Sequence, residues 1–306
     1  MLVSVAYFAS MASAAEPPIT AIDFTREGHQ LVGVSQRGLH LLQWPELEVI
    51  GVVQLPIPNL HAVSFSPDGT RIAVGGGSPA EEGRVQVVSW PEAQPGQTLH
   101  GHHDSVRAVA WLDNSDLVSA SIDQSVKRWS LVQQASVATL RGHSKSVDAL
   151  CALRGTNFIV TAGVDQSLRV WDFDAEEPLR SLNQHTGPVH ALAVRPVQEG
   201  LPIIASASSD FTIRFWQPTI GRMIRYIRLS AAPLAITWIN GGSHLVAGCD
   251  DGHIRVIDYD RLTVENDQDV MDGWVYAVKA HPFDGSVAAA GSGGTLRRVQ
   301  LKSLDH

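Results

Sequence analysis

One phrase returns three times in this 306-residue chain, and it limits what the chain can fold into. The copies read SASIDQSVKRWS at 119–130, TAGVDQSLRVWD at 161–172 and SASSDFTIRFWQ at 206–217. In each copy a Ser or Thr comes first, an Asp follows four residues later, and a Trp six residues after that. Three matches at the same internal offsets indicate a repeat with a period near 40 residues, which is typical of a ring or array of small units.

Weaker copies extend the series in both directions. Residues 245–258 keep the Asp but lose the Trp, and residues 287–300 lose both. Upstream, residues 72–90 carry an insertion and residues 31–44 form the most diverged copy. Seven units of about 41 residues therefore account for most of the chain.

Each unit contains short apolar runs separated by turn residues. In the fourth unit these runs are 147–153, 158–163, 167–173 and 178–182. All have strand length and are rich in β-branched and aromatic residues, and no long segment shows helical periodicity. The sequence therefore predicts an all-β protein.

The units resemble WD repeats, the blades of a β-propeller, over about nine-tenths of the chain. The family's Gly-His element is present as GHHDSV at 101–106 and GHSKSV at 142–147, and as QHTGPV at 184–189 with Gln in place of Gly. The resemblance implies a single seven-bladed propeller over 16–306 with four-stranded antiparallel blades. The expected blades are about 19–55, 59–99, 100–140, 141–182, 183–229, 230–270 and 271–303.

The resemblance also implies a structural hydrogen-bond set in each of three blades. In such a set the turn Asp accepts from the His, the His engages the Ser or Thr, and that hydroxyl accepts from the Trp indole. The implied sets are His102, Ser119, Asp123 and Trp129; His143, Thr161, Asp165 and Trp171; and His185, Ser206, Asp210 and Trp216. A hydrolase triad is the competing interpretation of Ser, His and Asp, but a triad occurs once, beside an oxyanion hole, so a threefold set containing Trp favours structure over catalysis.

A propeller is a rigid disc whose loops vary without disturbing the core, so the leading functional hypothesis is a non-enzymatic protein-interaction scaffold. In the family, partners dock near the Gly-His loops, beside residues just before the turn Asp. Those residues are Ile122, Val164, Ser209 and Asp250 here, and they suit a protein or peptide partner within a larger complex. The alternative is an enzyme with a metal-dependent hydrolytic site at the central axis, but no carboxylate or His recurs at an axis-facing position beyond the structural sets.

Composition narrows the classes of partner. The formal net charge is −8 and Lys and Arg are not clustered, which argues against nucleic-acid binding. No stretch is long and apolar enough to cross a bilayer. The two cysteines lack metal-ligand spacing, and the acidic run 265–272 lacks the glycine and closing Glu of an EF-hand loop. We therefore expect no metal and no cofactor.

The N-terminus supports two interpretations. Residues 2–12 form a short apolar run followed by Ala12-Ser13-Ala14, which resembles the cleavage site of a signal peptide over 1–15. The segment contains no Lys or Arg, however, and residues 2–8 also have strand character. Cleavage predicts an exported, periplasmic protein whose last blade has only three strands. Retention predicts a cytoplasmic protein in which this strand completes the ring.

Overall fold

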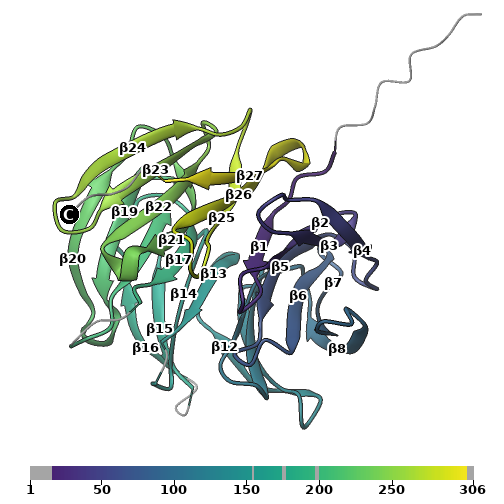
Figure 1. Cartoon of the computed structure of the whole chain (residues 1–306). Coiled ribbons are helices and arrows are strands. Elements are labelled where there is room, and N and C mark those ends of the chain that lie inside the picture. The colour runs from purple at the N-terminus through teal and green to yellow at the C-terminus, as the bar shows by residue number, and fades with distance from the viewer. Residues whose placement is uncertain (1–15, 154, 174–176, 197–199, 302–306) are drawn as a thin grey trace, which may run out of the picture.

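The computed structural model describes residues 16–153, 155–173, 177–196 and 200–301, and it shows seven antiparallel sheets arranged as the blades of a β-propeller (Figure 1). Six blades have four strands and the last has three. Among these described residues, helix is limited to three single-turn 3₁₀ segments, Pro218–Ile220, Asn240–Gly242 and Ser292–Gly294. The predicted all-β, seven-bladed fold with a three-stranded last blade is confirmed.

Within each blade the strands pair in chain order, and the first strand is the innermost. Blade 1 consists of β1 (Ala21–Phe24), β2 (Gln30–Ser35), β3 (Gly38–Gln43) and β4 (Val49–Val53). Blade 2 consists of β5 (Leu60–Phe65), β6 (Arg71–Ser78), β7 (Glu82–Ser89) and β8 (Pro95–His102). Blade 3 consists of β9 (Val106–Trp111), β10 (Asp116–Ser121), β11 (Ser125–Ser130) and β12 (Ala135–Arg141). Blade 4 consists of β13 (Val147–Ala152), β14 (Phe158–Gly163), β15 (Leu168–Asp172) and β16 (Glu177–Leu182).

The remaining blades follow the same order. Blade 5 consists of β17 (Val189–Val194), β18 (Ile204–Ser208), β19 (Thr212–Gln217) and β20 (Arg222–Arg228). Blade 6 consists of β21 (Pro233–Ile239), β22 (His244–Cys249), β23 (His253–Asp258) and β24 (Thr263–Asp269). Blade 7 consists of β25 (Val275–Ala280), β26 (Ser286–Gly291) and β27 (Leu296–Gln300).

The turn between the second and third strands is built by the repeated Asp. In blade 4 the backbone N–H of Ser167 donates to Asp165 Oδ1 at 3.1 Å, and Gln166 between them has a positive φ of 68°. Gln124 and Phe211 occupy the same left-handed position in blades 3 and 5. An Asp side chain that bonds its own backbone two residues on stabilises this kind of turn. The Asp therefore fixes the hairpin that starts each third strand.

The apolar core is divided into layers, with a cluster between each pair of neighbouring blades. The layer between blades 3 and 4, for example, packs Val118 and Val126 against Val147 and Trp171, all at most 1% exposed. Each sheet thus buries both faces, which explains the continuous apolar runs in the second strands. A blade contributes to two layers and depends on its neighbours for burial.

The ring closes where blade 7 meets blade 1, a contact that we call the seam. Figure 1 shows β25–β27 beside β1 and β2, and the inner strands β1 and β25 are in contact. The backbone N–H of Ile19 donates to Gly291 O at 3.2 Å, the Trp44 ring stacks on His281 at 5.6 Å, and Trp44 Nε1 donates to Asp284. In the part of the chain that the structure describes, β27 has no outer partner strand. The candidate closing strand 2–8 and the predicted signal peptide 1–15 lie outside the described residues.

Candidate binding face

The hydrogen-bond set in blade 3 joins four side chains in series. His102 Nδ1 lies 2.8 Å from Asp123 Oδ2, and His102 Nε2 lies 2.7 Å from Ser119 Oγ. The Trp129 indole N–H donates to the same Ser119 Oγ at 2.7 Å. If Nδ1 carries the proton, Asp123 accepts from the imidazole, the Ser119 hydroxyl donates to Nε2, and every polar atom has a partner.

This geometry leaves the serine no catalytic freedom. Ser119 is 0% exposed, and its oxygen already accepts from the Trp129 indole. A nucleophilic serine must instead be exposed beside a pre-formed oxyanion site. We therefore assign the set a structural role, because a fully satisfied buried network of this kind specifies one arrangement of the chain over others.

The same distances recur in the next two blades. His143 lies 2.9 Å from Asp165 and 2.8 Å from Thr161, and Trp171 donates to Thr161 at 2.7 Å. In the third set, the two His185 contacts, with Asp210 and Ser206, are 2.7 Å each, and the Trp216 contact with Ser206 is 2.8 Å. The structure thus brings all twelve predicted residues together in three groups of four.

Two features of these sets were missed from the sequence. His102 is the last residue of β8, the outer strand of blade 2, so its set joins two blades rather than strands of one blade. In addition, a hydroxyl two residues after each Asp donates to the second carboxylate oxygen. These contacts are Ser125 with Asp123 at 2.6 Å, Ser167 with Asp165 at 2.8 Å and Thr212 with Asp210 at 2.5 Å. The repeated Asp-x-Ser/Thr spacing was the available signal.

Burial and hydrogen bonding set the protonation of these groups. Burial lowers the pKa of His102 and of His185, and the partner Asp opposes this only in part. Burial alone would raise the pKa of Asp123, but hydrogen bonds from His102 and Ser125 outweigh it and hold that pKa well below its usual range. For Asp210 the same balance lowers the pKa to about 2. We therefore assign neutral imidazoles and ionised carboxylates to the sets of blades 3 and 5 at neutral pH.

In blade 6 the turn carboxylate has a different partner. This blade has no Trp at the equivalent position, where Ile257 stands, and the turn residue Asp251 pairs instead with Arg255 Nη2 at 2.6 Å. Arg255 is 4% exposed and also contacts Asp267 at 3.0 Å. The turn carboxylate is thus satisfied by a guanidinium rather than by an imidazole, and Asp267 from the acidic run is held in the same ion pair.

The four residues predicted to bind a partner occupy one repeated position. Each backbone N–H donates to a carbonyl just before the inner strand of its own blade: Ile122 to Ser105, Val164 to Ser146, Ser209 to Pro188 and Asp250 to Ala232, at 2.9–3.1 Å. All four are half-buried. They therefore lie at the same end of their blades, which we call the loop face.

A second repeated feature of the loop face was missed. At the start of every inner strand stand an apolar residue, a variable residue and Ala, in blade 1 with the Ala as the first strand residue, and we call these segments the axis triplets. They are Ile19-Thr20-Ala21, Leu60-His61-Ala62, Val106-Arg107-Ala108, Val147-Asp148-Ala149, Val189-His190-Ala191, Pro233-Leu234-Ala235 and Val275-Tyr276-Ala277. In blades 2 to 7 the strand register shifts at the variable residue, which makes it the extra residue of a β-bulge. Bulges re-aim side chains and are frequent beside functional sites.

The variable side chains interact with one another and with the predicted residues. Arg107 Nη1 lies 3.2 Å from His61 Nδ1 on the neighbouring blade, and His190 Nε2 lies 2.6 Å from Ser209 Oγ. Burial lowers the pKa of His190, with Asp148 opposing this shift and Arg107 adding to it. Polar contacts thus link the axis triplets of blades 2 and 3, and they link the blade 5 triplet to the predicted residue Ser209.

An aromatic pair lies at the axis triplet of blade 7. Trp274 precedes the triplet there, and its carbonyl accepts from Ser292 N, the same repeated contact that the other loops make. Its side chain is 50% exposed and meets Tyr276 edge to face at 5.8 Å. Exposed Trp beside charged groups is the composition of binding hot spots.

Two further features are a cavity at the seam and a group of potential metal ligands. A cavity of about 710 Å³ opens at the seam between Leu296 and the outer strand of blade 1, but its polar side chains are paired, Arg37 with Glu16 and His40 with Ser35. Among the described residues, one group has metal-ligand spacing: His244, Asp258 and Glu265. It lies at the end of β22 and β23 opposite the Asp251 turn, so it is separate from the loop face.

Comparison with a family model identifies the repeat. The model of the WD domain, G-beta repeat, matches residues 93–130, 134–172, 176–217 and 230–258. The chain is a WD-repeat β-propeller. Three of the four matched stretches include the outer strand of one blade and end in the third strand of the next, as 93–130 does with β8 and β9–β11, whereas 230–258 covers β21–β23 alone. This stagger explains why the His of each set precedes the inner strand of its blade: His102 ends β8, and His143 and His185 lie in the connections after β12 and β16.

Curated relatives of this WD-repeat chain come from eukaryotes. It is 26% identical over 174 residues to THO complex subunit 3 of Arabidopsis thaliana, covering 54% of this chain and 41% of the relative. It is 32% identical over 117 residues to WD repeat and HMG-box DNA-binding protein 1 of Xenopus laevis, covering 38% and 10%. It is 31% identical over 134 residues to the ribosome biogenesis protein WDR12 homolog of Drosophila erecta, covering 37% and 32%. The chain spans less than half the length of these relatives.

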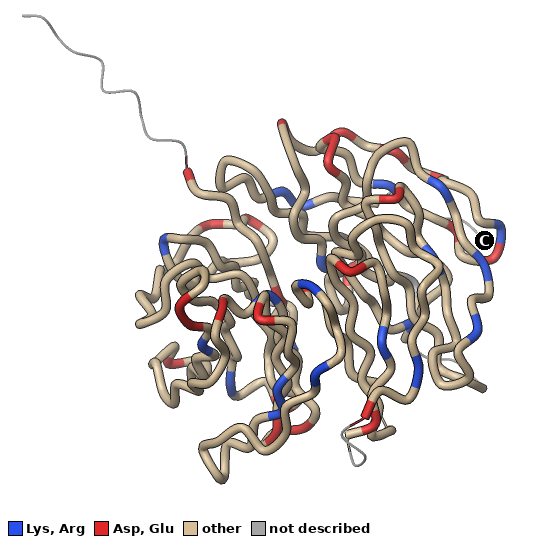
Figure 2. Tube along the Cα trace, turned by 180° about the vertical axis from the view of Figure 1, so that it is seen from behind, with Lys and Arg blue, Asp and Glu red and all other residues tan. Residues whose placement is uncertain are grey.

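These findings bear on the N-terminal hypotheses only indirectly. No helix among the described residues is long and apolar enough to cross a membrane. None of the relatives named above is described as exported, so the comparisons do not support the predicted signal peptide. Figure 2 shows acidic and basic segments interspersed over the molecule, without one concentrated basic face.

Proposed function

We propose that this propeller is a non-enzymatic scaffold that docks a protein or peptide on its loop face. The observation that carries the proposal is the set of axis triplets. Their flanking residues are apolar and Ala in every blade, whereas the middle residue differs in every blade except for His61 and His190. The constant apolar and Ala positions are explained by packing in the fold. The variable middle residues lie at one end of the ring, where they can form a surface specific for a partner.

The chemistry of that surface suits a polypeptide. It offers a cation at Arg107, a carboxylate at Asp148 and an aromatic anchor at Trp274. Mixed charge gives orientation to a partner, and a half-exposed Trp gives affinity. Ile122, Val164, Ser209 and Asp250 form the rim beside this centre in our proposal. The rigid blades hold these groups in fixed positions, which limits the entropy lost on binding.

The relatives' names guide the wider role. One is a subunit of the THO complex and another is a ribosome biogenesis protein. By analogy, we propose that this chain is a single propeller within a larger intracellular complex rather than an exported protein. Fold-level analogy carries no information on the identity of the partner.

The alternative function, a metal-dependent hydrolase at the axis, has less support. Such a site needs converging acidic and His ligands from several blades. The axis triplets do supply His61, Asp148 and His190, but among the described residues metal-ligand spacing occurs in blade 6 alone. We therefore keep the scaffold as the proposed function.

The test compares variants of the two faces. Arg107→Glu and Trp274→Ala change the loop face, while Phe283→Ser changes a 74% exposed residue in the β25–β26 hairpin at the opposite end of blade 7. The native complex is isolated with each variant, and contacts are mapped by cross-linking. We expect the loop-face variants to lose the partner and Phe283→Ser to retain it. Cross-links confined to the opposite face, or equal loss in all three variants, would refute the proposal.

A further inference from the structure

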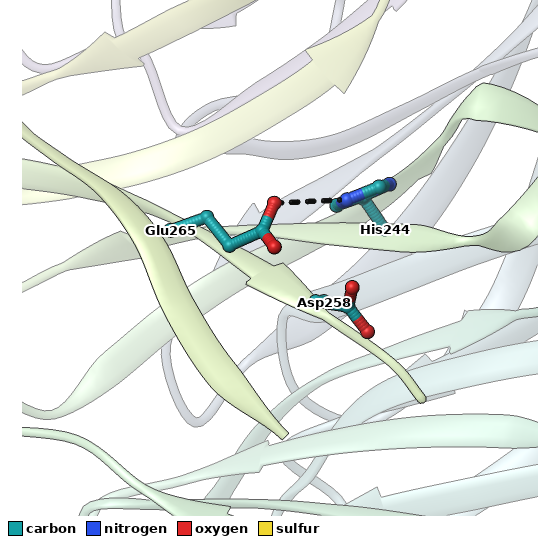
Figure 3. Close-up of side chains that lie close together, drawn as sticks. All are labelled: His244, Asp258 and Glu265. Atoms are coloured by element: carbon teal, nitrogen blue, oxygen red, sulfur yellow. Dashed lines mark hydrogen bonds and ion pairs between the residues drawn. The ribbon is translucent and has the colours of Figure 1, made fainter. Parts of the chain in front are cut away.

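Three potential metal ligands converge at the outer half of blade 6 (Figure 3). His244 begins β22, Asp258 ends β23 directly opposite it, and Glu265 comes from β24. Their ligand atoms all lie within 4.8 Å of one another, and His244 Nε2 is 3.1 Å from Glu265 Oε2. Figure 3 shows the Glu265 carboxylate and the Asp258 carboxylate on the same side as the imidazole.

A β-bulge accounts for the position of Glu265. On the β23–β24 ladder, Val256 pairs with Asn266 but Ile257 pairs with Val264, so Glu265 is the extra residue. Blades 1, 3, 4 and 5 have the same bulge in the outer strand, and there the extra residue is apolar. These residues are Ile50, Val137, Leu179 and Ile224. An acid at this position is therefore a departure of blade 6 from its own repeat.

Blade 6 also differs from the other blades at the positions of His244 and Asp258. In the blades whose ladder includes the pair equivalent to His244 and Asp258, that pair contains at most one His or carboxylate. These pairs are Gln30 with Gln43, Arg71 with Ser89, Asp116 with Ser130, Phe158 with Asp172 and Ser286 with Gln300. Among the described residues, blade 6 alone combines an imidazole with two carboxylates at these three positions. Random divergence of a repeat does not explain why three potential metal ligands come together in one blade.

The surroundings hold the ligands in place. Ser243 Oγ lies 2.8 Å from His244 Nδ1, which orients the ring with Nε2 toward the carboxylates. Backbone N–H groups of Asp260 and Arg261 donate to Asp258 Oδ1 at 2.7 Å, so that this oxygen is fixed and Oδ2 faces the group. A ligand His whose second nitrogen is hydrogen-bonded is a general feature of metal sites.

One cation already touches the group. Arg261 Nη1 lies 3.2 Å from Glu265 Oε1 and 3.5 Å from Asp258 Oδ2, and its side chain is 72% exposed. Such an exposed ion pair contributes little energy. A divalent ion that binds all three ligands can displace this guanidinium into solvent.

We propose that His244, Asp258 and Glu265 form a zinc-binding site, with water as the fourth ligand. One nitrogen and two carboxylate oxygens suit Zn²⁺. Zinc bonds of about 2.0–2.2 Å place tetrahedral ligand atoms about 3.3 Å apart. The imidazole and Glu265 already have nearly this separation, so a small shift of Asp258 completes the site. The ion would fasten the outer strand β24 to β22 and β23.

Zinc titration of the full chain, by calorimetry and by competition with a chromogenic chelator, tests the proposal. We expect one high-affinity equivalent in the wild type. Glu265→Gln keeps the shape of a partly exposed side chain but removes the charge of a direct ligand. Since the loss of an outer-shell partner already weakens metal binding about 10–100-fold, this variant should weaken zinc binding by at least that much. His244→Gln should do the same. Because His244 is buried, the folding of His244→Gln is checked by circular dichroism. If His244→Gln fails to fold, the zinc affinity of Glu265→Gln decides the matter.

The matched control is His253→Gln. His253 belongs to the same blade and pairs with Asp267 at 2.7 Å, but it lies outside the group. It should retain wild-type zinc affinity, and Co²⁺ should give the visible spectrum of a tetrahedral site in this control and not in Glu265→Gln. The proposal is overturned if the wild type binds no stoichiometric zinc, in which case the group is an ion-pair cluster with Arg261 as its cation. Equal weakening in His253→Gln would also overturn it, because binding would then be spread over surface histidines.

Discussion

Removing one turn carboxylate should loosen a junction between two blades. In Asp165→Ala, His143 Nδ1 loses an acceptor 2.9 Å away, and the His143 side chain is 0% exposed, so water does not replace it. A change of tautomer only transfers the problem, because Thr161 Oγ1 already accepts from Trp171 and its own hydrogen would then lack an acceptor. The N–H of Ser144 also loses Asp165, but Ser144 is exposed to water. The buried hydroxyl of Ser167 loses Asp165 too and keeps only a long contact of 3.4 Å with His143 Nδ1.

The magnitude follows from the one fully buried group. Leaving a buried donor unsatisfied costs about 1–3 kcal/mol, and at about 2 °C per kcal/mol for a chain of this size the melting temperature should fall by ~2–6 °C. The control is Gln166→Ala, in the same turn, whose exposed side chain should change the free energy of unfolding by less than about 0.5 kcal/mol. Both variants are compared by scanning calorimetry. Equal losses in the two variants would refute the network argument.

Three further predictions concern other parts of the molecule. Burial, with a smaller contribution from Arg107, lowers the pKa of His61 to about 4; the unfolded chain therefore binds this proton below about pH 6.5 while the folded chain does not, and stability should fall between pH 6.5 and 4. Chemical denaturation across that range should show a smaller slope for His61→Gln, and an unchanged slope would contradict the assignment. Gly75→Ala should destabilise by about 1–3 kcal/mol, because a Cβ there would lie 2.7 Å from Val106 Cγ1 of the next blade; Gly51→Ala, whose Cβ would meet Leu41 at 3.6 Å, should be nearly neutral in the same melts. Purified protein should show no hydrolysis of ester, lactone or phosphate substrates with or without divalent metal, and a turnover abolished by Asp148→Asn would favour the enzyme hypothesis instead.

The fold was predictable because a propeller blade requires only apolar strand runs at a regular spacing and few specific residues. Spacing and apolar strand runs were enough for blades 1, 2 and 7, which lack the Asp and Trp signals. The three hydrogen-bond sets were predictable in membership because their four residue types recur at fixed offsets. Their placement across two blades was not, because the repeat in sequence is staggered by one strand from the blade in space.

The binding face was harder to predict for a different reason. The middle residue of each axis triplet varies, so a search for a recurring His or carboxylate misses this position. The signal lies in the constant neighbours, such as Val106 and Ala108, which are constrained by packing. The group at Glu265 was hidden in the same way, since a bulge in the outer strand decides which way that side chain points and nothing in the local sequence announces it.

The seam differs from the other six junctions between blades in how its two sides are connected. At every other junction the polypeptide itself runs from an outer strand into the next inner strand, and at three of them a His set reinforces the crossing. Within the described residues, blades 7 and 1 are joined by side-chain packing, by a few hydrogen bonds such as that from Ile19 to Gly291, and by an ion pair between Lys279 and Asp23. The described residues therefore form a linear series of blades, and the ring can open at the seam. Openings that start there expose a single core layer, so amides of β1 and β27 should exchange with solvent before those of any interior blade.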